Sequence, residues 1–212
     1  MRRVTIVSYS PGGTSRKIAE TLAGYFSPAY CTIDLTDPSV RQTNYFFSNE
    51  DLLIFAAPSY LGRLPVVEGG IFDHIYANDT PGIFLATFGN RSYEDMLLEM
   101  AQIAEDRGVI GIGALALAIS GRTQADEVRR GELKKAWKLE TFADNMLQIL
   151  NGIEEDPAYY ERHSLKVNGN FPYKTHERTD ACQEPFFSQI RTPRRAKSVE
   201  YFYMKPDRRA YV

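Results

Sequence analysis

The sequence predicts a doubly wound α/β fold, because apolar segments with strand character alternate with helical patterns along the first 150 residues. Several apolar segments are hydrophobic on both faces, which is typical of parallel strands covered by helices on both sides. We expect these strands at residues 4–8, 30–35, 52–57, 83–88 and 109–118. In such a sheet, ligands bind beyond the carboxyl ends of the strands, at the switch point next to the first strand.

Helical patterns lie between and after these strands, at residues 15–26, 66–76, 93–107 and 126–150. In the first, Ile18, Leu22 and Phe26 form one stripe, while Ala19 and Ala23 are small enough to pack flat on a sheet. The last pattern repeats apolar residues at near-helical spacing through Trp137, which is therefore expected in the core rather than at a cofactor. The pattern amounts to five β-α units.

Composition and charge narrow the class of protein. A chain of 212 residues can bury one sizeable core, and 43% hydrophobic residues are typical of a globular protein. A net charge of -2 gives no reason to expect nucleic acid or membrane as a partner. The apolar run after Arg3 is too short for a signal peptide, and no run approaches membrane-spanning length. We therefore expect a cytoplasmic protein.

Cysteine and histidine offer no metal or nucleophilic site. Cys31 and Cys182 are far apart and form no CxxC motif, so neither a disulfide framework nor a metal-thiolate site is indicated. Cys31 lies in a predicted strand and is expected to be a small buried hydrophobe. His74 falls within a predicted helix and is interpreted as structural. Asp34, Asp37 and Asp51 border strands and are interpreted as caps or turns.

The loop after the first predicted strand has the composition of a phosphate site. Gly12 and Gly13 allow the backbone to approach an anion, and Ser10, Thr14 and Ser15 can donate hydrogen bonds. The helix that follows has unpaired N–H groups and a partial positive charge at its start. Taken alone, the same residues are also those of an ordinary turn and helix N-cap. Neither a GxxxxGK[ST] nor a GxGxxG motif is present.

Two further loops follow strands and should lie at the same end of the sheet. One runs from Pro58 through Ser59, Tyr60 and Gly62 to Pro65, and the other continues from Thr87 to Asp95. Each offers an aromatic ring, glycine and hydrogen-bonding groups, as a flat heteroaromatic ring requires. The three loops together predict a site for a phosphorylated aromatic cofactor.

These motifs resemble the flavodoxin family, and more closely the flavodoxin-like domain that precedes a bacterial-type ferredoxin in a group of flavoproteins. That group shows S-P-T-G-T-T-(K/R)-K-I-A, P-x-Y-x-G-R-x-P and Y-G-N-R-x-Y. This chain has S-P-G-G-T-S-R-K-I-A from Ser10, P-S-Y-L-G-R-L-P from Pro58 and F-G-N-R-S-Y from Phe88. The resemblance covers about residues 3 to 150. It implies a sandwich whose five-stranded parallel sheet has the order 2-1-3-4-5.

The resemblance also implies FMN as the cofactor. It assigns the phosphate to the first loop and the isoalloxazine to the second and third loops, whose candidate residues are Ser10, Gly12, Gly13, Thr14, Ser15, Pro58, Ser59, Tyr60, Gly62, Thr87, Gly89, Asn90, Arg91 and Tyr93. Gly12 replaces the usual threonine, which removes one hydroxyl donor. A hydrogen bond to a charged group contributes about 1.5 to 3 kcal/mol, so weakened binding is expected.

Five residues of the ring loops have alternative interpretations. Tyr60 and Tyr93 are predicted to contact the flavin ring, but could be ordinary surface tyrosines. Gly62 either permits a peptide flip or is a simple turn glycine. Arg63 and Arg91 differ from the acidic surroundings of the flavin in ordinary flavodoxins. If they point inward, they would favour the reduced flavin anion; otherwise they bind an anionic substrate or face water.

The pattern changes after residue 152, so residues 1–152 are predicted as the FMN domain and 153–212 as a C-terminal tail. Residues 169–174 resemble the Gly-Asn-(F/Y)-Pro-Tyr-Lys linker that leads to a ferredoxin in the fusion group. The cluster cysteines are absent, since Cys182 supplies one of four thiolates. We expect a solvated or loosely docked tail, and a truncated or altered ferredoxin is one hypothesis for its origin.

Three functions are compatible with the sequence. The first is electron transfer by an FMN protein to a redox partner protein or a small acceptor, with the chemistry belonging to the flavin. The second is an NAD(P)H-dependent FMN or quinone reductase, which shares the fold. The third is a flavin-free interaction module. No catalytic side chain is predicted.

Overall fold

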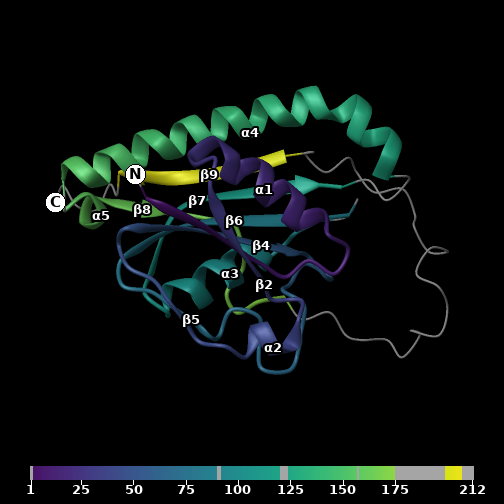
Figure 1. Ribbon diagram of the computed structural model, residues 1–212, viewed down its shortest axis with the longest axis horizontal. Helices are drawn as coiled ribbons and strands as arrows, with labels where there is room; N and C mark the ends of the chain where they lie inside the picture. The colour runs from purple at the N-terminus through teal and green to yellow at the C-terminus, as the bar shows by residue number, and fades with distance from the viewer. Residues whose placement is uncertain (1, 90–91, 120–123, 157, 175–198, 207–212) are drawn as a thin grey trace.

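The structure is a computed structural model that describes residues 2–89, 92–119, 124–156, 158–174 and 199–206 (Figure 1). Its strands are β1 (Arg3–Ser8), β2 (Tyr30–Asp34), β3 (Tyr45–Phe46), β4 (Asp51–Pro58), β5 (Ile75–Tyr76), β6 (Thr80–Phe88), β7 (Val109–Ala118), β8 (His163–Leu165) and β9 (Val199–Pro206). Its helices are α1 (Thr14–Phe26), α2 (Pro38–Arg41), α3 (Met96–Glu105), α4 (Gln124–Glu155) and α5 (Tyr159–Arg162).

The predicted α/β fold is confirmed. The parallel strands lie in the order β2-β1-β4-β6-β7, which is equivalent to the expected 2-1-3-4-5. The sheet continues with β9, which pairs antiparallel with β7, and with β8, which pairs antiparallel with β9. Because β1 is flanked by β2 and β4, the chain turns in opposite directions on either side of it. The carboxyl end of β1 is therefore the switch point of the sheet.

Helices cover both faces of the sheet and enclose two cores (Figure 1). On one face, α1 and α4 bury Leu22, Phe142 and Met146 against the sheet. On the other face, α3 and the segment that precedes β5 bury Met100 and Phe72. Strands β4 and β6 are buried along almost their whole length, as expected for strands with helices or loops on both sides.

The helix predicted at residues 66–76 is wrong. Residues 66–74 form turns, and Ile75–Tyr76 is the short strand β5. Gly69 and Gly70 have φ values of 77° and 70°, which are incompatible with a right-handed helix. The apolar residues of this segment are nevertheless buried, which accounts for the misleading pattern. His74 lies in this loop, and its Nδ1 is 2.8 Å from Asn44 Oδ1.

Cys31 is exposed, so the prediction that it is a buried hydrophobe is wrong. It lies on β2, the edge strand of the sheet, where residues 30–32 are all exposed. Asp37 caps α2 by accepting from Ser39 N, and Asp51 accepts from Ser48 N in the turn before β4. The interpretation of these two carboxylates as a cap and a turn is confirmed.

Where the structure describes the C-terminal segment, its strands β8 and β9 belong to the sheet and are not loosely docked. Strand β9 pairs with β7 from Val199↔Leu117 to Tyr203↔Gly113, and so covers the edge that β7 would otherwise expose. The division into a domain of residues 1–152 and a tail stays a prediction. Cys182 lies outside the described residues, and so does the side chain of Trp137. No helix in the described part of the chain is long and apolar enough to cross a membrane.

Candidate functional site

The three predicted loops meet at the carboxyl ends of neighbouring strands. Pro58 at the end of β4 pairs with Thr87 of β6, and Ser59 N donates to Thr87 O at 2.7 Å. The hydroxyl oxygens of Ser15 and Thr87 are 2.7 Å apart in a buried hydrogen bond that connects the first loop to the third. The loops therefore form one continuous surface around the switch point.

The first loop is a tight turn from Ser10 into α1. Gly13 N donates to Ser10 O at 2.8 Å, and Gly13 has a φ of 73°, which makes glycine the natural residue there. Ser10 Oγ accepts from Arg16 N at 3.2 Å, while Ser10 N donates to Thr36 Oγ1 at 2.9 Å. As an acceptor in the first bond, the Ser10 hydroxyl retains a proton that it can donate to an anion.

Ser15 differs in orientation from the other predicted phosphate donors. The residue is 2% exposed and its hydroxyl bonds to Thr87, so it joins two loops instead of facing outward. Its main-chain N–H lies in the first turn of α1, where no intrahelical partner is available. The same helix start includes Thr14. The expected site thus depends on main-chain donors, with hydroxyl groups at Ser10 and Thr14.

The second loop contains a two-residue hairpin. Tyr60 and Arg63 exchange main-chain hydrogen bonds of 3.0 and 3.1 Å, and the central residues Leu61 and Gly62 have φ values of 53° and 79°. Positive φ at both central positions matches a type I′ turn. A Cβ on Gly62 would lie 2.6 Å from Glu94 Cβ, so only glycine fits against the third loop. Gly62 is therefore a turn glycine here; the peptide flip stays a prediction.

Arg63 is held by an ion pair that sequence reasoning missed. Its Nε and one terminal nitrogen bind Glu99 at 2.8 and 2.7 Å, and its guanidinium stacks 4.1 Å from the Tyr173 ring centroid. The hydrogen bond to Glu99 raises the pKa of Arg63. Arg63 thus points toward α3 and the C-terminal segment, and its charge is compensated by Glu99.

The third loop, predicted from Thr87 to Asp95, includes the last two residues of β6 and leaves the sheet at Gly89; Asn90 and Arg91 lie outside the described residues. Tyr93 is 7% exposed, packs against Phe88 with ring centroids 5.5 Å apart, and donates from its hydroxyl to Glu200 Oε2 at 2.6 Å. Burial is the main cause that raises the pKa of Tyr93, and the hydrogen bond to Glu200 raises it further. By contrast, Tyr60 is 52% exposed. Tyr60 is therefore better placed than Tyr93 to stack on a ligand.

Asp95 is a second feature that sequence reasoning missed. Its fully buried carboxylate accepts three hydrogen bonds of 2.7 Å, from Asn170 N, Asn170 Nδ2 and Lys174 N. Burial alone would raise the pKa of Asp95, but the bonds from Lys174 and Asn170 outweigh it and hold the pKa below its usual range. The signal in the sequence is the motif at residues 169–174, which by itself predicts only a linker.

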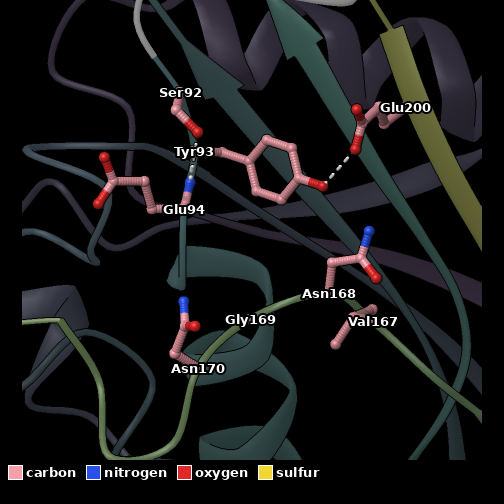
Figure 2. Close-up of a pocket in the computed structure, with 8 residues that line it drawn as sticks. All are labelled: Ser92, Tyr93, Glu94, Val167, Asn168, Gly169, Asn170 and Glu200. Carbon is pink, nitrogen blue, oxygen red and sulfur yellow. Dashed lines mark hydrogen bonds between the residues drawn. The ribbon is translucent and has the colours of Figure 1, made fainter.

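An open pocket lies between the third loop and the C-terminal segment (Figure 2). Its volume is about 510 Å³, and Figure 2 shows the Tyr93 hydroxyl pointing across it toward Glu200. Residues 167–170 run along the opposite side. The pocket is lined mainly by polar groups, so it differs from the apolar slot expected for a flavin ring.

The three loops nevertheless have features that suit FMN. Cβ atoms built on Gly12, Gly13 or Gly89 would meet no atom within 4 Å, so these main-chain segments border open space. Gly12, unlike Gly13 and Gly62, does not have a positive φ. Ser59 Oγ is buried and has no hydrogen-bond partner among the described residues, which leaves a polar atom for a ligand. The residues present therefore fit the cofactor.

Comparison with known proteins adds distant similarity to solved structures. No protein-family model matches the sequence, and no curated protein matches it. A crystal structure described as "a Putative flavoprotein" from Bacteroides uniformis ATCC 8492 is similar to this chain, with a TM-score of 0.39 and 12% sequence identity. The alignment covers 62% of this chain and 98% of that chain. A similarity this distant leaves the function to be argued from the site.

Proposed function

We propose that this protein binds FMN non-covalently at the three loops and transfers electrons between redox partners. The observation that carries the proposal is the convergence of the loops on open space at the switch point. The hydrogen bond between the hydroxyls of Ser15 and Thr87 and the bond from Ser59 N to Thr87 O hold the loops together, while Gly12, Gly13 and Gly89 leave room at the surface. Doubly wound sheets bind ligands at this position.

Different parts of the chain would hold the phosphate and the ring of FMN. The start of α1, with Ser10 and Thr14, would hold the phosphate through N–H and hydroxyl groups, and the helix dipole favours the anion. The exposed Tyr60 ring would cover one face of the isoalloxazine. Bound FMN would supply the electron-accepting and electron-donating chemistry, and the chain would orient it and limit its contact with water.

A binding experiment tests this proposal. The purified protein is titrated with FMN and with riboflavin while flavin fluorescence and the visible absorption spectrum are recorded; heat release and chromatography identify any flavin already bound. We expect FMN to bind more tightly than riboflavin, because only FMN uses the phosphate loop. A protein that carries no flavin once excess FMN has been removed by gel filtration would refute the proposal and favour a flavin-free interaction module. Steady turnover with NAD(P)H and a quinone alone would instead indicate a reductase.

A further inference from the structure

We propose that residues 167–174 act as a clamp that shapes the ring-binding loops, and that Asp95 is the positioning residue through which the clamp acts. This inference rests on the proposed function, because the loops in question are those assigned to the flavin ring. It gives the C-terminal segment a part in the cofactor site, although that segment follows the last parallel strand by about fifty residues.

Asp95 connects the clamp to both ring loops. It ends the third loop, and its carboxylate accepts from Asn170 N, Asn170 Nδ2 and Lys174 N, each at 2.7 Å. Its own N–H donates to Gly62 O at 3.0 Å, at the tip of the second-loop hairpin. A buried carboxylate with three donors has one favourable position, so the clamp determines where the Asp95 main chain presents its N–H.

Two other contacts connect the same segments independently. Tyr173 of the clamp lies under the Arg63 guanidinium, at the base of the second-loop hairpin, with 4.1 Å between guanidinium carbon and ring centroid. Gly169 packs on α3 so closely that a Cβ there would lie 2.7 Å from Leu98 Cβ. The clamp thus approaches α3 at the point where the third loop ends, and Figure 2 shows Asn168, Gly169 and Asn170 passing beside that loop.

The geometry leads to a specific dependence. The phosphate loop has contacts of its own with Thr36 and Thr87, and none of the contacts described above joins it to the clamp. Weakening the clamp should therefore loosen the hairpin at residues 60–63 and the end of the third loop, and should leave the phosphate loop in place. The loss should appear in the affinity for the flavin ring, which FMN and riboflavin share.

The test compares Asp95→Asn with Asp51→Asn. Asp51 is also a buried carboxylate with three donors, from Ser48 N, Ser48 Oγ and Arg3, but it lies at the opposite end of the sheet. Both variants should unfold at a lower temperature. We expect Asp95→Asn to lose roughly ten- to a hundredfold in affinity for FMN and for riboflavin alike. We expect Asp51→Asn to bind both flavins as the wild type does. Equal affinities in the two variants would overturn the inference.

Two additions keep the test decisive. If Asp95→Asn does not fold, Asn170→Ala replaces it, because Asn170 is exposed and the change removes the Nδ2 donor while the main-chain N–H of residue 170 remains. Hydrogen exchange is also measured on the flavin-free protein, where the Arg63 and Asp95 amides should exchange faster in Asp95→Asn than in Asp51→Asn. Should the wild type bind no flavin, the proposed function fails. The difference in hydrogen exchange between the two variants then tests by itself whether the clamp holds the loops. Faster exchange with unchanged flavin affinity, in a protein that binds flavin, overturns the inference.

Discussion

Gly12→Thr should tighten the binding of FMN. A Cβ at this position meets no atom within 4 Å, and Gly12, unlike Gly13, does not have a positive φ. The backbone therefore accepts an L-residue without strain. The resemblance to flavodoxins places a threonine hydroxyl here, and the position lies within the turn that precedes α1. A threonine would add a hydroxyl donor to the proposed phosphate site without displacing any group.

The size of the effect follows from the charge of the acceptor. A hydrogen bond to a charged group contributes about 1.5 to 3 kcal/mol, which corresponds to a roughly ten- to hundredfold gain in affinity. Gly12→Ala is the matched control, because it restricts the unfolded backbone and adds a methyl group but no donor. It should raise the free energy of unfolding by about 0.4 to 1 kcal/mol and leave the FMN affinity near the wild-type value.

Fluorescence titrations of both variants with FMN and riboflavin measure the effect. The ratio of the FMN to the riboflavin dissociation constant should fall in Gly12→Thr and remain unchanged in Gly12→Ala. If threonine gives no more than alanine does, the hydroxyl does not reach a phosphate. The assignment of this loop to the phosphate would then be refuted, even if the protein binds flavin by its ring.

Three other predictions concern the loops and their supports. Thr14→Val should weaken FMN binding by about 1.5 to 3 kcal/mol and leave riboflavin binding unchanged. Thr21→Val, which removes an exposed hydroxyl of the same helix, is the control. Equal losses of affinity for both flavins in Thr14→Val would contradict the prediction. In spectroelectrochemistry, Arg63→Gln should lower the flavin midpoint potential by about tens of millivolts, and Glu99→Gln should raise it by a similar amount. The double variant should have the potential of the wild type, because the paired charges compensate each other. A large shift of the potential in the double variant would refute that compensation. Because burial and Glu200 raise the pKa of Tyr93, the neutral phenol stabilises the folded state fully below about pH 10 and this contribution is lost as the pH rises further. In urea denaturation between about pH 9 and 11.5, Tyr93→Phe should therefore lose less stability with rising pH than the wild type, and parallel curves would exclude the effect.

The candidate site could be predicted in position but not in its internal contacts. Turns that follow apolar strands indicate which loops share an edge of a parallel sheet, and Ser15, Ser59 and Thr87 do lie together there. The orientation of each side chain is a different matter. Ser15 turns toward Thr87, and Arg63 turns toward Glu99, because each finds a partner 72 and 36 residues away. No local pattern carries that information.

The sequence by itself determined the parallel sheet and the loops at its carboxyl edge, because hydrophobic periodicity and turn residues are local properties of the chain. The order of the strands was implied by the resemblance to flavodoxins and not by these local patterns. The sequence misjudged residues 66–76, where apolar side chains suggested a helix but left-handed glycines made turns. Only the tertiary structure decided the place of the C-terminal segment. The open edge of β7 accepts β9 through main-chain hydrogen bonds that any sequence can make, and Asp95 needs donors that arrive from 75 residues further along the chain. Such long-range pairings depend on which buried polar groups remain unsatisfied once the sheet has formed, and that is a property of the folded molecule.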